Sequence, residues 1–133
     1  MDEPVIKYYR KLLKSDFEYT GRIENPSIFL DSIGEKITIC ARVAKTYIHL
    51  YINITNNTIK DIKYLCMCDP TANVAVEVLC SLVKGKTIEE AKLITEDSFS
   101  QVVGSKGKDF LKSARGLIEL INRGISRYQA QQA

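Results

Sequence analysis

The sequence predicts an α+β fold in which a three-stranded antiparallel β meander packs against four to five helices. Apolar and polar residues alternate along 36–43 and again along 47–54, which is typical of half-buried strands. After Pro70 the pattern changes to apolar residues at three- and four-residue spacing, which indicates helices. Because the strands come first and most of the helices follow, this order favours segregated α+β layers over a repeating βαβ unit.

Three strands are expected between residues 36 and 68. The first covers 36–43, and a tight link at Ala44–Lys45 leads to the second, in which alternate residues form one apolar and one polar face. Asn56 and Asn57 favour a hairpin turn, because asparagine tolerates positive φ, and the third strand returns over 58–68. The apolar face of the second strand holds Ile48, Leu50, Ile52 and Ile54, and its polar face holds Tyr47, His49, Tyr51 and Asn53.

Helices are predicted before and after the strands along the chain. Pro4 begins one that ends near Ser15, and 16–34 is expected to be irregular because glycine and proline interrupt it. Asp69 is a favoured N-cap and Pro70 a favoured first residue for the second helix. That helix should end at Gly85, and a capping box at 87–90 should open a short helix through Leu93. The remaining predictions are a helix from Thr95 to Gly104, a long helix from Asp109 that Gly124 interrupts or ends, and a frayed tail at 129–133.

Length and composition exclude several classes of protein. A chain of 133 residues, 45% hydrophobic and 26% charged, fits one globular domain over residues 1–133. The net charge of +3 comes from interspersed charges, so we expect no nucleic-acid partner. No apolar run approaches the ~18 residues of a membrane span. Four cysteines without a preceding signal sequence favour free thiols in the cytoplasm. With a single histidine and no hydrolase or nucleotide-binding motif, we expect no enzymatic activity.

The strongest candidate site is the junction between the third strand and the second helix. Cys66 and Cys68 should point to the same face, with Asp69 beside them. A thiol just before a helix N-terminus is biased towards the thiolate, so Cys68 is the best candidate for chemistry. We therefore interpret Cys66, Cys68 and Asp69 as possible metal ligands, or the two thiols as a persulfide site. The alternatives are buried, inert thiols and an aspartate that only caps the helix.

The other sulfur and nitrogen ligands have simpler interpretations. Cys40 is expected on a strand, from which it either approaches the Cys66 and Cys68 thiols or stays isolated. Cys80 falls on an apolar helical stripe and is predicted to lie in the core. His49 is interpreted as a solvated or packed residue in preference to a metal ligand. Its tyrosine neighbours, Tyr47 and Tyr51, could form a partner surface.

Several phrases of the sequence resemble the IscU/NifU N-terminal family of iron-sulfur cluster assembly scaffolds. They are Ile59–Tyr64 before the cysteine turn, Leu82–Ala91 after it, and Phe17–Glu18 near the end of the first helix. The resemblance covers most of the chain. Aligned without gaps, it places Asp69 on the second cysteine of the family, with Cys68 one residue earlier. The first and third family cysteines fall near 44–46 and at Phe110, so the resemblance implies a divergent member with a reduced ligand set.

The resemblance also implies what the chain does. A member of this family would bind an iron-sulfur cluster, or an iron or zinc ion, and would interact with a cysteine desulfurase and cluster-accepting proteins. The predicted ligands are Cys66, Cys68 and Asp69, and the protein is expected to be a monomer or a weak homodimer. Two alternatives stay open: a metal-free protein-binding module that keeps the scaffold fold, and thiol redox chemistry or a sulfur relay through Cys66 and Cys68.

Overall fold

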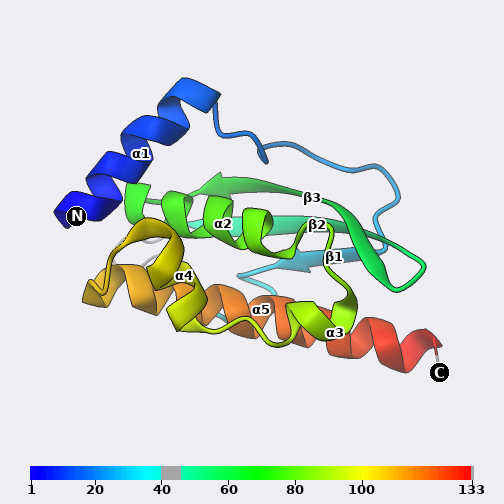
Figure 1. Ribbon diagram of the computed structural model, residues 1–133. Helices are drawn as coiled ribbons and strands as arrows, with labels where there is room; N and C mark the ends of the chain where they lie inside the picture. The colour runs from blue at the N-terminus through cyan, green and yellow to red at the C-terminus, as the bar shows by residue number, and fades with distance from the viewer. Residues whose placement is uncertain (40–45, 133) are drawn as a thin grey trace.

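The computed structural model describes residues 1–39 and 46–132, and it has the predicted α+β architecture (Figure 1). Helix α1 (Glu3–Ser15) precedes the strands β1 (Ile28–Asp31), β2 (Tyr47–Thr55) and β3 (Thr58–Met67). Helices α2 (Pro70–Val83), α3 (Ile88–Ala91), α4 (Glu96–Val103) and α5 (Lys108–Gln132) follow. Within the described part of the chain, no helix is long and apolar enough to cross a membrane.

The sheet is an antiparallel meander in the order β1-β2-β3, as expected. Leu50 of β2 lies opposite Leu30 of β1 and Tyr64 of β3, and all three are buried on the inner face. Asn56 and Asn57 form the β2–β3 turn with φ angles of 52° and 63°, which confirms the predicted hairpin. The outer edge of β3 is covered by the chain after α1, where the N–H of Tyr64 donates to the carbonyl of Tyr19.

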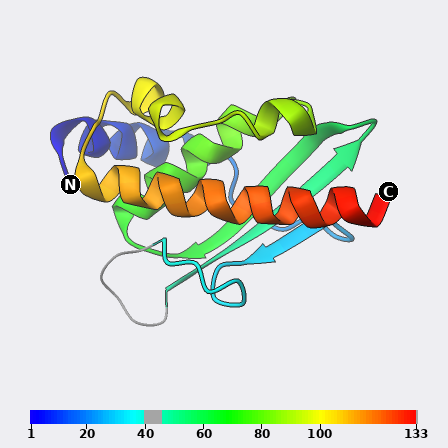
Figure 2. The same cartoon turned by 90° about the horizontal axis from the view of Figure 1, so that it is seen from below.

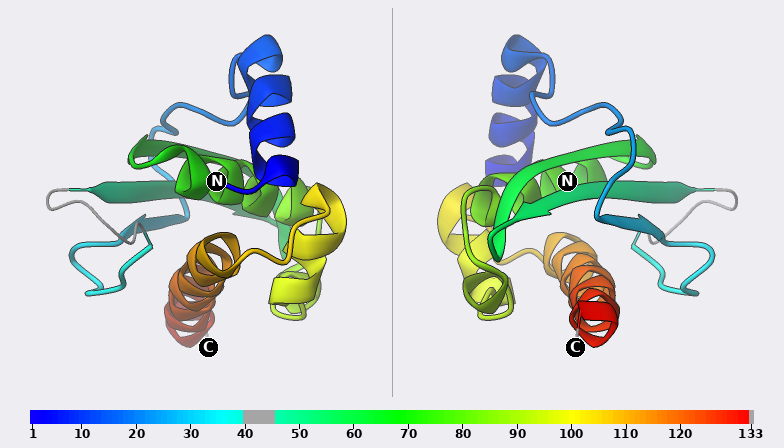
Figure 3. Two further views of the ribbon diagram at one scale, coloured as in Figure 1. Left: turned by 90° about the vertical axis from the view of Figure 1, so that its left-hand side faces the viewer. Right: turned by 90° about the vertical axis from the view of Figure 1, so that its right-hand side faces the viewer.

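The helices cover the inner face of this sheet. Helix α2 contacts β3, and α5 contacts β1. Helix α2 lies between α1 and α5 (Figures 1 and 3), and α5 runs along most of the length of the molecule (Figure 2). Nine of the fourteen residues of α2 are buried, so α2 is the central helix of the core. The start of α2, where β3 ends, is therefore attached to the best-packed helix of the molecule.

The start of the sheet was predicted in the wrong segment. The first strand is Ile28–Asp31, inside the stretch predicted to be irregular, and residues 36–39 are not a strand. Ile37 and Ile39 are buried without strand pairing, and the hydroxyl of Ser113 in α5 donates to the carbonyl of Ile39 at 2.8 Å. The apolar alternation therefore reflects packing against α5. The rest of that predicted strand, with Cys40, and the predicted link at 44–45 lie outside the described residues.

Helix α5 also differs from its prediction. It continues through Gly124 and remains helical to Gln132, so neither an interruption nor a frayed stretch at 129–132 is seen. A Cβ on Gly124 would lie 2.7 Å from a methyl group of Leu30 and 3.1 Å from one of Ile28. Gly124 is thus the residue that lets α5 approach β1. Close packing offsets the low helix propensity of glycine at this position.

The local signals at the other helix ends were read correctly. Gly85, just after α2, and Gly104, the C-cap of α4, have φ angles of 83° and 80°. The capping box before α3 is present: the N–H of Glu90 donates to the Thr87 hydroxyl at 3.1 Å, and the Thr87 N–H donates to the Glu90 carboxylate at 2.9 Å. The residues of each motif lie within a few positions of one another, so these motifs can be recognised without knowledge of the fold.

Candidate functional site

The candidate site lies where β3 ends and α2 begins. Pro70 occupies the first turn of α2, and Asp69 is the N-cap with φ −72° and ψ 165°. The Asp69 carboxylate accepts a hydrogen bond from the N–H of Ala72 at 2.8 Å. This satisfies one of the backbone donors that a helix leaves unpaired at its start, and it fixes the direction in which the chain leaves the strand.

The two cysteines of this junction lie side by side. Cys66 is on the inner face of β3, two residues after the buried Tyr64, and Cys68 lies in the turn before Asp69. Both side chains are half-buried against the edge of the core. Their sulfurs are joined as a disulfide, with the two Cα atoms 5.5 Å apart. The prediction that the two side chains share one face is confirmed, whereas the expectation that all four thiols are free is wrong for this pair.

Asp69 has the capping role that the sequence predicted for it. Its carboxylate caps α2, which is the simpler of the two roles considered. Across residues 1–39 and 46–132, no three His, Cys, Asp or Glu side chains are grouped so that they could hold a metal ion. The structure thus brings two of the three predicted ligands together. A ligand role for Asp69 stays a prediction, and Cys40 lies outside the described residues.

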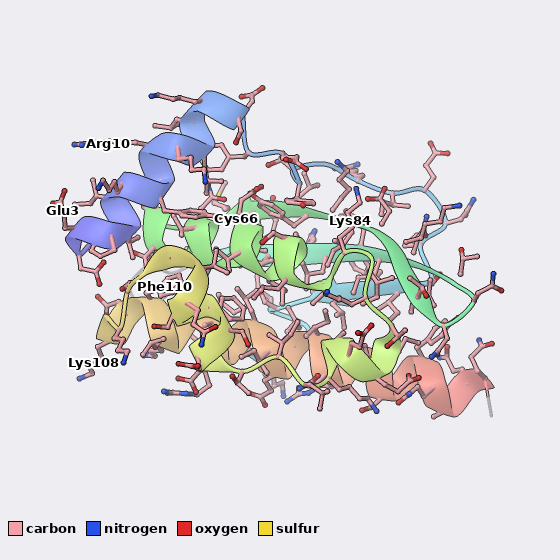
Figure 4. All side chains as sticks on the ribbon, viewed as in Figure 1. Glu3, Arg10, Cys66, Lys84, Lys108 and Phe110 are labelled. Carbon is pink, nitrogen blue, oxygen red and sulfur yellow. A yellow bond between two sulfur atoms is a disulfide. The ribbon has the colours of Figure 1, made fainter. Side chains whose placement is uncertain are left out.

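The position that resembles the third family cysteine is also close to this junction. Phe110, near the start of α5, and Thr71, in the first turn of α2, line one cavity of about 310 Å³ with the first residues of the chain. Figure 4 shows Phe110 and Cys66 in the half of the molecule that holds α1. Phe110 is buried and its ring contacts that of Phe99. At this position an apolar ring therefore replaces a sulfur ligand and contributes to the core.

A buried polar network links α2 to β3 and to the segment after α1, and sequence reasoning missed it. Glu77 of α2 is only 3% exposed, and its Oε2 accepts a hydrogen bond from the N–H of Tyr19 at 3.1 Å. The Tyr64 hydroxyl lies 2.8 Å from this same oxygen and 2.8 Å from the amide oxygen of Asn73. Burial raises the pKa of Glu77 and also that of Tyr64. The available signal was a single acid within an otherwise apolar helix.

The thiol of Cys80 is buried in the core. Cys80 is 0% exposed within α2, which confirms its predicted place. Burial raises the pKa of its thiol well above the ordinary value, and the nearby Glu77 carboxylate adds to this. Because the thiolate is the reactive form, Cys80 is chemically inert in the folded protein.

The outer face of the sheet carries the predicted aromatic residues. His49 lies between Phe29 and Tyr47, with ring centroids 5.3 Å and 4.6 Å away, and its Nε2 is 3.4 Å from a carboxylate oxygen of Asp31. Tyr51 contacts Phe29 from the other side. His49 is therefore a packed residue with an acidic neighbour, as interpreted from the sequence. An interaction role for this face remains a prediction.

The fold and the sulfur pair together define a small α+β domain with a thiol site at the start of its central helix. The chain belongs to the family of the NifU-like N-terminal domain, which matches residues 24–133. It is 29% identical over 108 residues to each of two proteins of Archaeoglobus fulgidus, iron-sulfur cluster assembly scaffold proteins IscU 1 and IscU 2. The match covers 81% of this chain and 66% of each relative, so the chain spans slightly less than two thirds of their length.

Solved structures share the fold of this chain. A candidate iron-sulfur cluster assembly scaffold of the SUF system from Fervidobacterium islandicum AW-1 superposes with a TM-score of 0.65 at 15% identity, covering 94% of this chain and 96% of that one. The N-terminal NifU-like protein of Brucella abortus gives a TM-score of 0.64 at 12% identity, covering 99% and 95%. At these identities the superpositions establish the fold, and the chemistry has to be argued from the residues.

Proposed function

We propose that this chain is a scaffold-like or carrier-like protein of iron-sulfur cluster assembly, with iron or a nascent cluster as its cargo. The observation that carries the proposal is the contact between the Cys66 and Cys68 sulfurs at the start of α2. Membership of the NifU-like family and the names of the Archaeoglobus relatives support the same conclusion. Thiolates are the usual protein ligands of iron-sulfur clusters, so a close pair fits this cargo.

The cargo would be bound by an incomplete set of protein ligands. In the reduced protein Cys66 and Cys68 supply two thiolates, and Asp69 could supply an oxygen if its carboxylate kept one oxygen on the Ala72 N–H. The remaining ligands would come from a partner, a second copy of the chain or a small thiol. Because a shared ligand is lost when its donor leaves, this arrangement favours transfer over storage. We propose a cysteine desulfurase as sulfur source, cluster-accepting proteins as recipients, a cytoplasmic location and no enzymatic activity of the chain itself.

Anaerobic reconstitution tests this function. The reduced protein is mixed with ferrous iron and sulfide, desalted, and examined for visible sulfur-to-iron charge-transfer absorption and for bound iron. We expect both signals in the wild type and in the control Cys80→Ala, whose thiol is buried. Cys66→Ser and Cys68→Ser should each lose most of the signal. The absence of absorption in the reduced wild type, with and without an added small thiol, would overturn the proposal.

A metal-free partner module is a second candidate, because no three-donor group is found in the described part of the chain. It predicts that a variant with Cys40, Cys66, Cys68 and Cys80 all changed to serine still binds a cysteine desulfurase with wild-type affinity. Circular dichroism checks that this variant is folded, since serine at buried position 80 costs stability. Loss of binding by the folded variant would favour the thiol-dependent function.

A further inference from the structure

The Cys66–Cys68 pair has the backbone geometry of a disulfide that closes without moving the fold. The two Cα atoms are 5.5 Å apart, inside the range of about 4.4–6.8 Å in which disulfides form. Residues two apart in a regular strand are farther apart than this, by the rise of ~3.3 Å per residue. The chain shortens the distance because β3 ends at Met67 and Cys68 already belongs to the turn before α2.

A stabilising role does not account for this bond. A disulfide stabilises a fold mainly by closing a long loop of the unfolded chain, and this one spans a single residue. Both sides of the bond are also held by other interactions. Cys66 pairs with Ile48 in the sheet, and Asp69 is tied to Ala72 at the start of α2. The bond therefore adds little constraint that the backbone does not already have.

Both cysteines lie near the surface of the molecule and are only partly buried. Cys66 and Cys68 are half-buried at the edge of the core, and Met67 between them is 59% exposed. Cys80 offers no competing partner, because it is sealed within α2 and its thiol pKa is raised by burial. Among the described cysteines, only those of the pair are thus partly exposed.

We propose that Cys66 and Cys68 form a thiol–disulfide exchange site whose substrates are low-molecular-weight thiols and disulfides. One thiolate of the reduced pair attacks a sulfur of the small disulfide, which forms a mixed disulfide and releases one small thiol. The second thiolate then attacks the protein sulfur of the mixed disulfide, forms the Cys66–Cys68 bond and releases a second small thiol. The protein gives up two electrons and two protons, which the small disulfide gains, and the reverse reaction restores the thiols.

The exchange would also affect the proposed function. This effect depends on the proposed function, whereas the exchange itself does not. A disulfide has no thiolate to offer iron, so the oxidised pair cannot bind the cargo that the reduced pair binds. Oxidation by a small disulfide would thus switch cargo loading off without unfolding the protein. The exchange itself needs no metal and can be measured on the metal-free chain.

The test is a redox titration of the metal-free, full-length wild type in mixtures of glutathione and glutathione disulfide. Samples are quenched with acid, alkylated and mapped by mass spectrometry. We expect a reversible Cys66–Cys68 crosslink without glutathione adducts. Cys66→Ser and Cys68→Ser, checked for folding by circular dichroism, should each stop at a stable mixed disulfide on the remaining thiol. Cys80→Ala should titrate like the wild type.

Three results would overturn the exchange site. The pair could stay reduced in excess glutathione disulfide, both cysteines could keep their own glutathione adducts, or either could crosslink to Cys40 instead. A second measurement separates this inference from the proposed function, namely iron binding by the oxidised and the reduced wild type. If the crosslink forms reversibly but neither state binds iron, the exchange site stands and the scaffold function fails. If the reduced protein binds iron but no crosslink forms, the opposite conclusion follows.

Discussion

The Cys66–Cys68 pair and Cys80 differ in their surroundings, and the difference shows how strongly the environment of a cysteine determines its chemistry. Cys66 and Cys68 lie half-buried at a chain reversal, with their sulfurs in contact. Cys80 lies within α2, is fully buried and has a raised thiol pKa. We propose ligation and exchange for the pair, whereas Cys80 packs as a small apolar side chain in the core. The buried network of Glu77, Tyr64 and Tyr19 links β3, which carries Cys66, to α2, which carries Cys80.

The largest expected effect is a difference in alkylation rate between the two environments. After reduction, Cys66 and Cys68 should react readily with iodoacetamide. Cys80 should react at least about a thousandfold more slowly, because its thiol must first be exposed by local opening, at a cost of about 4 kcal/mol or more. Quenched time points and peptide mapping give the rate at each position. Equal rates at all three positions would show that the core around α2 is open.

Removal of the Glu77 carboxylate should weaken the packing of α2 against β3 and the segment after α1. In Glu77→Ala the N–H of Tyr19 loses its acceptor and the Tyr64 hydroxyl loses one of two, so we expect a loss of about 2–4 kcal/mol in the free energy of unfolding. Urea denaturation measures it. Glu77→Gln is the matched control, since its amide oxygen can still accept both hydrogen bonds. The alkylation rate of Cys80 should rise in Glu77→Ala far more than that of Cys66; a uniform rise would contradict a local role.

A smaller effect is expected at the start of α2. Asp69→Ala removes the acceptor for the Ala72 N–H and should lower the free energy of unfolding by about 1 kcal/mol. Asp69→Asn keeps a capping oxygen, so its free energy of unfolding should fall by only a few tenths of a kcal/mol. Fraying of the first turn should speed the alkylation of Cys68 and leave Cys80 unchanged. If Cys80 responds as strongly as Cys68, the two environments are coupled through the whole helix.

The parts of the fold that were predicted correctly are those whose signals are long or local. Strand β2 alternates over nine residues, and Asp69 and Pro70 mark the start of α2 within two. Strand β1 was missed because its four residues are too few to show a period, and Ile28 and Leu30 are recognisable only by their pairing with β2. Gly124 was misread because the contact with Leu30 that favours it lies more than ninety residues away in the chain.

In the candidate site, too, the features with a local sequence signal were predicted and those that depend on tertiary contacts were not. The closeness of Cys66 and Cys68 was predicted from the two-residue period of a strand, although Cys68 lies in the turn after β3 and not on the strand itself. The bond between them was not, because it depends on how tightly the chain turns before α2. Glu77 was overlooked because its partners come from β3 and the segment after α1, which only the folded chain brings to α2. Polar networks of this kind are tertiary features with a weak local signature.

The smallest expected effect is a dependence of stability on pH that Glu77 causes. Burial raises the pKa of its carboxyl in the folded protein above the ordinary value of 4.5. The folded state therefore holds this proton more tightly than the unfolded chain does, so the contribution is fully present below the unfolded pKa and is lost as pH rises through the raised one. Urea denaturation between pH 4 and pH 8 should show the wild type losing stability relative to Glu77→Gln with rising pH. An unchanged difference across this range would mean that the Glu77 carboxyl binds its proton equally tightly in the folded and the unfolded chain, so that its pKa is not raised by burial.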